Sequence, residues 1–230
     1  MYYKNIRKGR FISRSNRFIA EVEVDGSKNL CHVKNTGRCR ELLIESAEIF
    51  VQFDDKAGRK TKYSLINVIK GKRLINIDSQ APNKIFYEWI LKDNLFKNIE
   101  KIKPEYTYKN SRFDFYVKTS EKDILIEIKG ATLEENGVVL FPDAPTERGL
   151  KHIYELCDAR LNGYDSYIIF IIQMKDVLYL SPNFKTHKAF GDALLYAESH
   201  GVNVLAFDCI VTENSIDVNK KVNVILNNYI

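Results

Sequence analysis

The amino-acid sequence predicts an α+β protein of two domains, an all-β domain at residues 1–82 and an α/β domain at residues 83–230. Two observations carry this fold class. Short apolar segments separated by turn residues fill the first part, which is the pattern of small β-barrels. Strand patterns alternate with helix patterns in the second part, as in α/β domains. The segment Ala81-Pro82-Asn83 separates the two parts.

About five short strands are expected in the first domain. The segment Gly9–Val24 alternates apolar and polar residues in its second half, and Asp25-Gly26 is a turn signal. The other strands are expected at Leu30–Val33, Ala47–Phe53, Tyr63–Ile69 and Leu74–Ile77, with a hydrophilic loop at residues 54–62. Strands and turns at this spacing fit a small closed barrel.

Positive charge is concentrated in this first domain. Residues 1–82 contain 17 Lys and Arg against 9 Asp and Glu, although the net charge of the whole chain is only +5. A nucleic-acid partner would account for this asymmetry, and so would a solvated basic face. The residues of a single-strand binding platform would be Arg10, Arg14, Arg17, Phe11 and Phe18, of which the two Phe fit the barrel core equally well.

A second feature of the barrel is the turn Asn35-Thr36-Gly37-Arg38, just past a predicted strand. Asn, Thr and Gly are ordinary turn residues, so a purely conformational role is sufficient to explain them. The functional alternative is an anion pocket made of backbone N–H groups, with Asn35 in the turn and Arg38 at the rim.

The second domain is expected to begin with a helix over Lys84–Phe96, capped by Asn83, whose broad apolar stripe would dock on a sheet. Glu88 lies in the middle of this helix. Such a residue is most often solvated, but at the edge of the sheet it would supply a carboxylate to a site. A later helix is expected after the cap Thr146.

The remaining elements alternate along the chain. Strands are expected at Val138–Phe141, Tyr167–Met174, Val177–Leu180 and Val202–Cys209, with a helix from about Thr186 to Ser199. The unbroken apolar character of the second of these strands indicates burial on both faces, and Gln173 closes it. The Lys- and Asn-rich segment from Asp217 is expected to be a surface extension.

Two short strands within residues 111–130 hold the candidate catalytic groups. Because side chains alternate along a strand, Asp114 is expected opposite an apolar face made by Phe113, Phe115 and Val117. Glu127 and Lys129 lie side by side on the next strand, opposite its isoleucines. If these strands pair, the two carboxylates and the ammonium group converge.

This group suits phosphodiester hydrolysis. Asp114 and Glu127 would bind Mg²⁺ or Mn²⁺ through oxygen, and Lys129 would orient water or offset charge on phosphorus. A structural ion pair is the alternative interpretation. The same acidic-x-Lys spacing occurs in Asp54-Asp55-Lys56, in a hydrophilic loop where nothing would fix a metal.

Five stretches carry a family resemblance. They are N-T-G-R at 35–38, A-P-N at 81–83, S-R-F-D-F at 111–115, E-I-K-G-A-T-L at 127–133 and F-P-D-A-P-T-E-R-G-L-K-H at 141–152. On these the chain resembles the sugar fermentation stimulation protein A (SfsA) family over nearly its whole length. The resemblance implies an OB-like barrel, then a PD-(D/E)xK nuclease-like α/β domain that binds DNA and cleaves DNA or RNA with a divalent metal.

The resemblance also implies roles for particular residues. Asp114, Glu127 and Lys129 correspond to the nuclease motif, and Glu88 and Gln173 would support it. If Arg148 and Lys151 are functional, their positive groups face the scissile phosphate or the strand path; a charged solvent face of the helix is the alternative. One departure is His32-Val33-Lys34-Asn35, where the family commonly has proline before the Asn.

Several classes of protein are not supported. There is no Gly-rich phosphate loop, serine elbow or zinc signature, so a small-molecule or sugar enzyme lacks support. The four cysteines have no C-x-x-C spacing and are expected to be buried thiols. No segment has the length and apolarity of a signal sequence or membrane span, so we expect a cytoplasmic protein.

Two functions therefore remain for the chain. The first is a metal-dependent nuclease whose basic barrel holds the strand. The second is a non-enzymatic DNA-binding regulator of sugar-utilisation genes on a nuclease-derived fold. The sequence leaves the oligomeric state open, a homodimer included.

Overall fold

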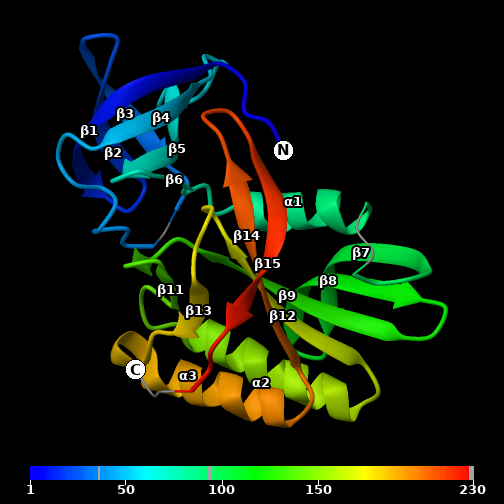
Figure 1. Ribbon diagram of the computed structural model, residues 1–230. Helices are drawn as coiled ribbons and strands as arrows, with labels where there is room; N and C mark the ends of the chain where they lie inside the picture. Colours follow the sequence, from blue (N-terminus) through cyan, green and yellow to red (C-terminus); the bar gives the residue numbers. More distant parts are fainter. Residues whose placement is uncertain (36, 93–94, 228–230) are drawn as a thin grey trace.

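The computed structural model describes residues 1–35, 37–92 and 95–227 (Figure 1). The strands of the first domain are β1 Ile6–Asn16, β2 Ile19–Val24, β3 Ser27–Val33, β4 Glu48–Phe53, β5 Tyr63–Lys70 and β6 Arg73–Asn76. The helices are α1 Ala81–Ile90, α2 Glu147–Leu161 and α3 Phe184–Ser199. The other strands are β7 Ile99–Tyr108, β8 Ser111–Thr119, β9 Asp123–Ala131, β10 Glu134–Glu135, β11 Val138–Phe141, β12 Asp165–Ile172, β13 Tyr179–Pro182, β14 Asn203–Val211 and β15 Ile216–Val224.

The first domain is a closed barrel, as expected. The strands follow the order β3-β2-β1-β4-β5, and a parallel pairing of β3 with β5 closes the ring. The segment predicted as one strand over Gly9–Val24 folds back as the hairpin β1–β2. Phe11 is buried inside the barrel, whereas Phe18 in the hairpin turn is 47% exposed. Of the two candidate stacking residues, Phe11 therefore belongs to the core.

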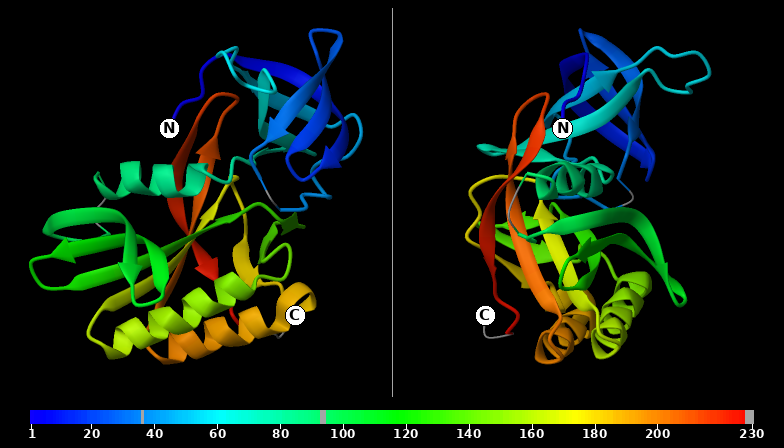
Figure 2. Two further views of the ribbon diagram at one scale, coloured as in Figure 1. Left: turned by 180° about the vertical axis from the view of Figure 1, so that it is seen from behind. Right: turned by 90° about the vertical axis from the view of Figure 1, so that its right-hand side faces the viewer.

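The second domain is an α/β domain, which confirms the predicted fold class. Its sheet has the order β10-β11-β13-β15-β14-β12-β9-β8-β7, with β9, β12 and β14 parallel. The helix α1 lies on one side of this sheet and α2 and α3 lie on the other (Figures 1 and 2). Side-chain alternation explains the division, because Ile126 of β9 packs in the α1 cluster and Leu125 in the α2–α3 cluster.

Helix α1 differs from its prediction. It begins at Ala81, after the N-cap Gln80, and ends at Ile90. Proline is tolerated in the first turn because the N–H groups there have no intrahelical partner, so Pro82 starts the helix instead of preceding it. Asn83 consequently lies inside the helix and is not its cap. Residues 93 and 94 of the predicted helix lie outside the described residues.

The predicted surface extension from Asp217 is also wrong. That segment is β15, which lies between β14 and β13 in the sheet. Ile216 and Val222 are buried. A hairpin with β14 places these apolar side chains against the core and leaves the intervening lysines in solvent.

A buried network of polar side chains joins the barrel to the sheet. The Nδ2 of Asn76 donates to the hydroxyl of Tyr3 and to Oδ1 of Asn67, at 3.2 and 2.9 Å. Nδ2 of Asn67 in turn donates to the carbonyls of Thr212 and Glu213. The junction between the domains is therefore fixed by hydrogen bonds. Among the described residues, no helix is long and apolar enough to cross a membrane.

Candidate metal and nucleic-acid site

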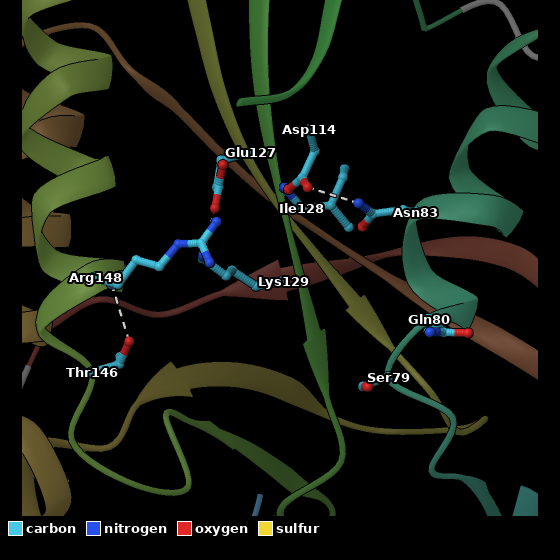
Figure 3. A pocket seen from close by; sticks show the side chains of 10 residues that line it. Ser79, Gln80, Asn83, Asp114, Glu127, Ile128, Lys129, Thr146 and Arg148 are labelled. Carbon is cyan, nitrogen blue, oxygen red and sulfur yellow. Dashed lines mark hydrogen bonds and ion pairs between the residues drawn. The ribbon is translucent and has the colours of Figure 1, made fainter. Parts of the chain in front are cut away.

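A cavity of about 490 Å³ opens between α1, the strands β8 and β9 and the first turn of α2 (Figure 3). Its lining residues are Ser79, Gln80, Asn83, Asp114, Glu127, Ile128, Lys129, Thr146, Arg148 and Gly149. The two carboxylates and the lysine predicted to converge do meet on this cavity.

Asp114 reaches the cavity because β8 and β9 separate there. Their pairing runs only as far as Phe115 and Ile126, and beyond it the N–H of Ile128 donates to Oδ2 of Asp114 at 2.7 Å. Phe113 then turns toward α2, while Phe115 packs against α1. The prediction that these two phenylalanines share one face is wrong for this reason.

Helix α1 supplies the second partner of Asp114. The Nδ2 of Asn83 donates to Oδ1 of Asp114 at 2.7 Å (Figure 3). Burial, and secondly the charge of Glu127, raise the pKa of Asp114 to about 6, although the bonds from Ile128 and Asn83 act in the opposite direction. The site therefore disfavours the ionised form of Asp114 unless a further positive charge, such as a cation, lies beside it.

Glu127 lies deeper and is held at one oxygen. Its Oε1 is 2.6 Å from Nζ of Lys129 and 2.6 Å from Nδ1 of His152. Burial by itself would raise the pKa of Glu127, but the hydrogen bond with His152 and the charge of Lys129 outweigh it and lower that pKa. The second oxygen, Oε2, is buried and has no hydrogen-bond partner.

Of the two basic residues predicted on α2, one reaches this cavity. Arg148 extends from the first turn of the helix toward Glu127 and Lys129 (Figure 3). Lys151 does not line the cavity, because its Nζ donates to the carbonyl of Asn110 at 3.1 Å and lies 3.7 Å from Glu155.

The two predicted supporting residues lie elsewhere. Glu88, on the far side of α1, pairs with the amino group of Met1 at 3.0 Å. Gln173 is buried, and its Nε2 donates to Oδ1 of Asn76 and to the carbonyl of Asp78. Neither lines the carboxylate cavity, so Glu88 is not a third ligand beside Asp114 and Glu127. Over residues 1–35, 37–92 and 95–227, no three His, Cys, Asp or Glu side chains form a metal-binding group.

The predicted basic residues of the barrel have different environments. Arg14 is engaged internally, because its guanidinium donates to the carbonyls of Arg17, Asn35, Gly37 and Arg38 at 2.7–2.9 Å. Asn35 forms the turn itself, accepting from the N–H of Gly37 at 2.7 Å. Arg10 lies apart, in a hollow shared with Glu23, Asp25 and Glu48.

Arg17 and Arg38 line a separate basic hollow of about 310 Å³ on the barrel. The other described lining residues are Arg14, Asn16, Gly37, Arg40 and Leu43, with no acidic side chain among them. The N–H of Arg38 donates to Oδ2 of Asp143, in the loop that leads into α2. This contact joins the hollow to the domain that holds the carboxylates.

Two residues of the carboxylate site were missed by the sequence analysis. Asn83 was assigned as a cap, and His152 was given no role in the site. The signal for Asn83 was the adjacent Pro82, which favours a helix start one or two residues earlier. His152 is buried on α2 together with Ile153 and Leu156, and these two apolar neighbours are the signal that could have placed it on the buried side of the helix.

Comparison with known proteins decides the family. Residues 12–77 match the SfsA N-terminal OB domain, and residues 80–215 match the sugar fermentation stimulation protein RE domain. The chain belongs to the SfsA family. This confirms the resemblance and the OB assignment of the barrel.

Relatives and a solved structure agree with this family assignment. The sugar fermentation stimulation protein homolog of Clostridium beijerinckii is 61% identical over 98% of this chain and 100% of its own length. The Desulfitobacterium hafniense homolog is 60% identical over 94% of this chain and 95% of its own. The structure of Pyrococcus furiosus SfsA in complex with Ca²⁺ has a TM-score of 0.88 and 28% identity, covering 97% of both chains.

Proposed function

We propose that this protein binds DNA and hydrolyses phosphodiester bonds of DNA or RNA, using a divalent cation held by Asp114 and Glu127. The observation that carries the proposal is Oε2 of Glu127, a buried carboxylate oxygen without a partner, on the same cavity as the half-buried carboxylate of Asp114. A buried carboxylate oxygen without a partner is costly, and a cation shared with Asp114 offsets that cost.

The oxygen atoms present fit Mg²⁺ or Mn²⁺. Each oxygen of Asp114 accepts one hydrogen bond and retains a lone pair, and Oε2 of Glu127 accepts none. Carboxylate oxygens completed by water and phosphate are the usual ligands of Mg²⁺. The Ca²⁺ in the Pyrococcus furiosus relative supports an oxygen-ligand cation in this family. Bound there, the cation would acidify a water molecule and polarise a phosphoryl oxygen.

The side chains around the carboxylates have separate tasks in this proposal. Lys129 places a positive charge beside Glu127, where negative charge develops on the phosphate in the transition state. Arg148 presents a planar guanidinium at the mouth of the cavity, suited to two phosphate oxygens. His152 holds Glu127 through Oε1 and leaves Oε2 without a donor. In this proposal Asp114, Glu127 and Lys129 serve as the PD-(D/E)xK motif that the family resemblance implies.

In this proposal the barrel binds the nucleic-acid strand. Arg17, Arg38 and Arg40 are exposed around the basic hollow, where they attract phosphates. Phe18 is exposed beside Arg17, whose guanidinium lies 5.3 Å from the ring centre, and offers a surface for a base. Arg14 and Asn35 build the turn that carries these groups and do not themselves bind phosphate.

The test is incubation of the full chain with labelled single-stranded and duplex DNA and RNA, in Mg²⁺, Mn²⁺ or chelator. Wild type is expected to give products only with a divalent cation. Glu127→Gln and Lys129→Ala should lose at least about 100-fold in rate while binding DNA nearly as well. The matched control is Glu88→Gln, which changes a carboxylate outside the cavity and should cleave normally.

The opposite results identify the alternative function. Salt-sensitive binding without products under any cation would indicate a DNA-binding regulator. Cleavage that survives both Glu127→Gln and Lys129→Ala would remove the proposed site.

A further inference from the structure

The side chain that faces Asp114 from α1 is an amide and not a carboxylate. Asn83 is oriented by the bond from its Nδ2 to Oδ1 of Asp114, and it lies across the cavity from Glu127 (Figure 3). An amide NH₂ group only donates hydrogen bonds, so the atom nearest Asp114 cannot ligate a cation. At this wall α1 therefore contributes a donor where an acidic residue would contribute negative charge.

Resting on the proposed function, we infer that the site takes one divalent cation per chain and that Asn83 is the residue that limits it to one. Two-cation phosphodiesterases place their ions about 3.5–4 Å apart, each with oxygen ligands. The geometry here offers carboxylate ligands for a single ion.

The lone pairs available on the two carboxylates support one bound cation. Oε1 of Glu127 accepts from Lys129 and His152, and these two donors use both of its lone pairs. Only Oε2 of Glu127 therefore has lone pairs available for a cation. Asp114 has one open lone pair on each oxygen. These oxygens can bridge one ion, and within the described part of the chain no third acidic side chain joins them.

The net charge of the cavity lining also favours a single bound cation. The formal charges of Asp114 and Glu127 are balanced by those of Lys129 and Arg148 on the same lining. One divalent cation leaves an excess of two positive charges, which substrate phosphates can meet. A second cation would double that excess in a partly buried site, where repulsion between like charges is strong.

Counting bound Mn²⁺ tests the inference without any measurement of activity. The full chain, free of nucleic acid, is titrated with Mn²⁺ and followed by calorimetry and electron paramagnetic resonance. Wild type should bind one Mn²⁺ in the site, with the spectrum of an isolated ion, and Glu127→Gln should lose it. Asn83→Asp should bind two, with the exchange-coupled spectrum of neighbouring ions. Glu88→Gln, on the same helix, should still bind one.

A second variant covers the case in which Asn83→Asp does not fold, as judged by circular dichroism. Asn83→Ala removes the donor without adding charge, so it should keep one Mn²⁺ and bind it about tenfold more weakly, because Asp114 loses the group that orients it.

Each contrary result would refute a different claim. A coupled pair of Mn²⁺ ions in wild type or in Asn83→Ala would overturn the single-cation inference and leave the proposed function standing. A folded Asn83→Asp with one isolated ion would overturn the role of Asn83. The proposed function itself would be overturned if wild type bound no Mn²⁺, or bound only Mn²⁺ that Glu127→Gln does not remove.

Discussion

His152 on α2 and Glu127 on β9 are joined by a 2.6 Å contact between Nδ1 and Oε1, in surroundings that leave both side chains almost fully buried. The contact links a helix to the strand that carries the candidate site. It also determines which oxygen of Glu127 remains without a partner.

Replacing His152 should therefore weaken the site without removing a ligand. His152→Ala is expected to lower Mn²⁺ affinity and divalent-dependent cleavage by about 10- to 100-fold, because Glu127 loses the group that orients it. Calorimetry and a cleavage assay measure the two effects. His200→Ala is the control, since His200 caps the exposed end of α3. Equal activities for the two variants would contradict this role.

Asp114 should make stability depend on pH in the cation-free protein. Its pKa is raised from 3.8 to about 6, so the folded state holds the proton more tightly than the unfolded chain does. The stabilisation is complete below about pH 4 and is lost as the pH rises through 6. Asp114→Asn does not titrate. With chelator present, wild-type stability relative to this variant should fall by roughly 2–3 kcal/mol between pH 4 and 7. Urea unfolding at several pH values measures it, and a constant difference would refute the shift.

Two arginines of the barrel should behave in opposite ways. Arg14→Ala should lower the free energy of unfolding by about 2–4 kcal/mol, because four carbonyl groups lose their charged donor. Arg17→Ala should leave stability almost unchanged and reduce the salt slope of DNA binding by about one. Urea unfolding and binding at several salt concentrations separate them. A stable Arg14→Ala protein with a reduced slope would reverse the assignment.

Gln173 should be important for stability and not for the cation. Gln173→Leu leaves Oδ1 of Asn76 and the carbonyl of Asp78 without this buried donor. We expect a loss of about 2–3 kcal/mol on unfolding in urea. The Mn²⁺ count should stay at that of wild type, and loss of the bound ion in a folded variant would restore the catalytic role that the sequence suggested.

The convergence of Asp114, Glu127 and Lys129 was predictable because it depends on short-range rules. Alternation places alternate residues of a strand on one face, and a connection of only three residues makes neighbouring strands pair. The separation of β8 from β9 beyond Phe115 was not predictable from alternation, and beyond it Phe113 packs on His152 of α2 while Phe115 packs on α1.

The wrong assignment of Glu88 follows from the phase of a helix. Residues five apart are separated by roughly 140° around the helix axis, so Asn83 and Glu88 cannot both face the cavity. The sequence analysis placed Asn83 outside the helix and so left Glu88 free to point inward. The position of Pro82 decides the phase, and with it which residue of α1 meets Asp114.

The position of β15 bears on how the protein is made. Residues 216–224 leave the ribosome after every other strand of this sheet, yet they separate β13 from β14 in the middle of the sheet. The barrel uses only residues from the first third of the chain, so it can close during synthesis. The sheet must wait for its final strand, and a nascent chain cut short before residue 216 would present two open strand edges to neighbouring polypeptides.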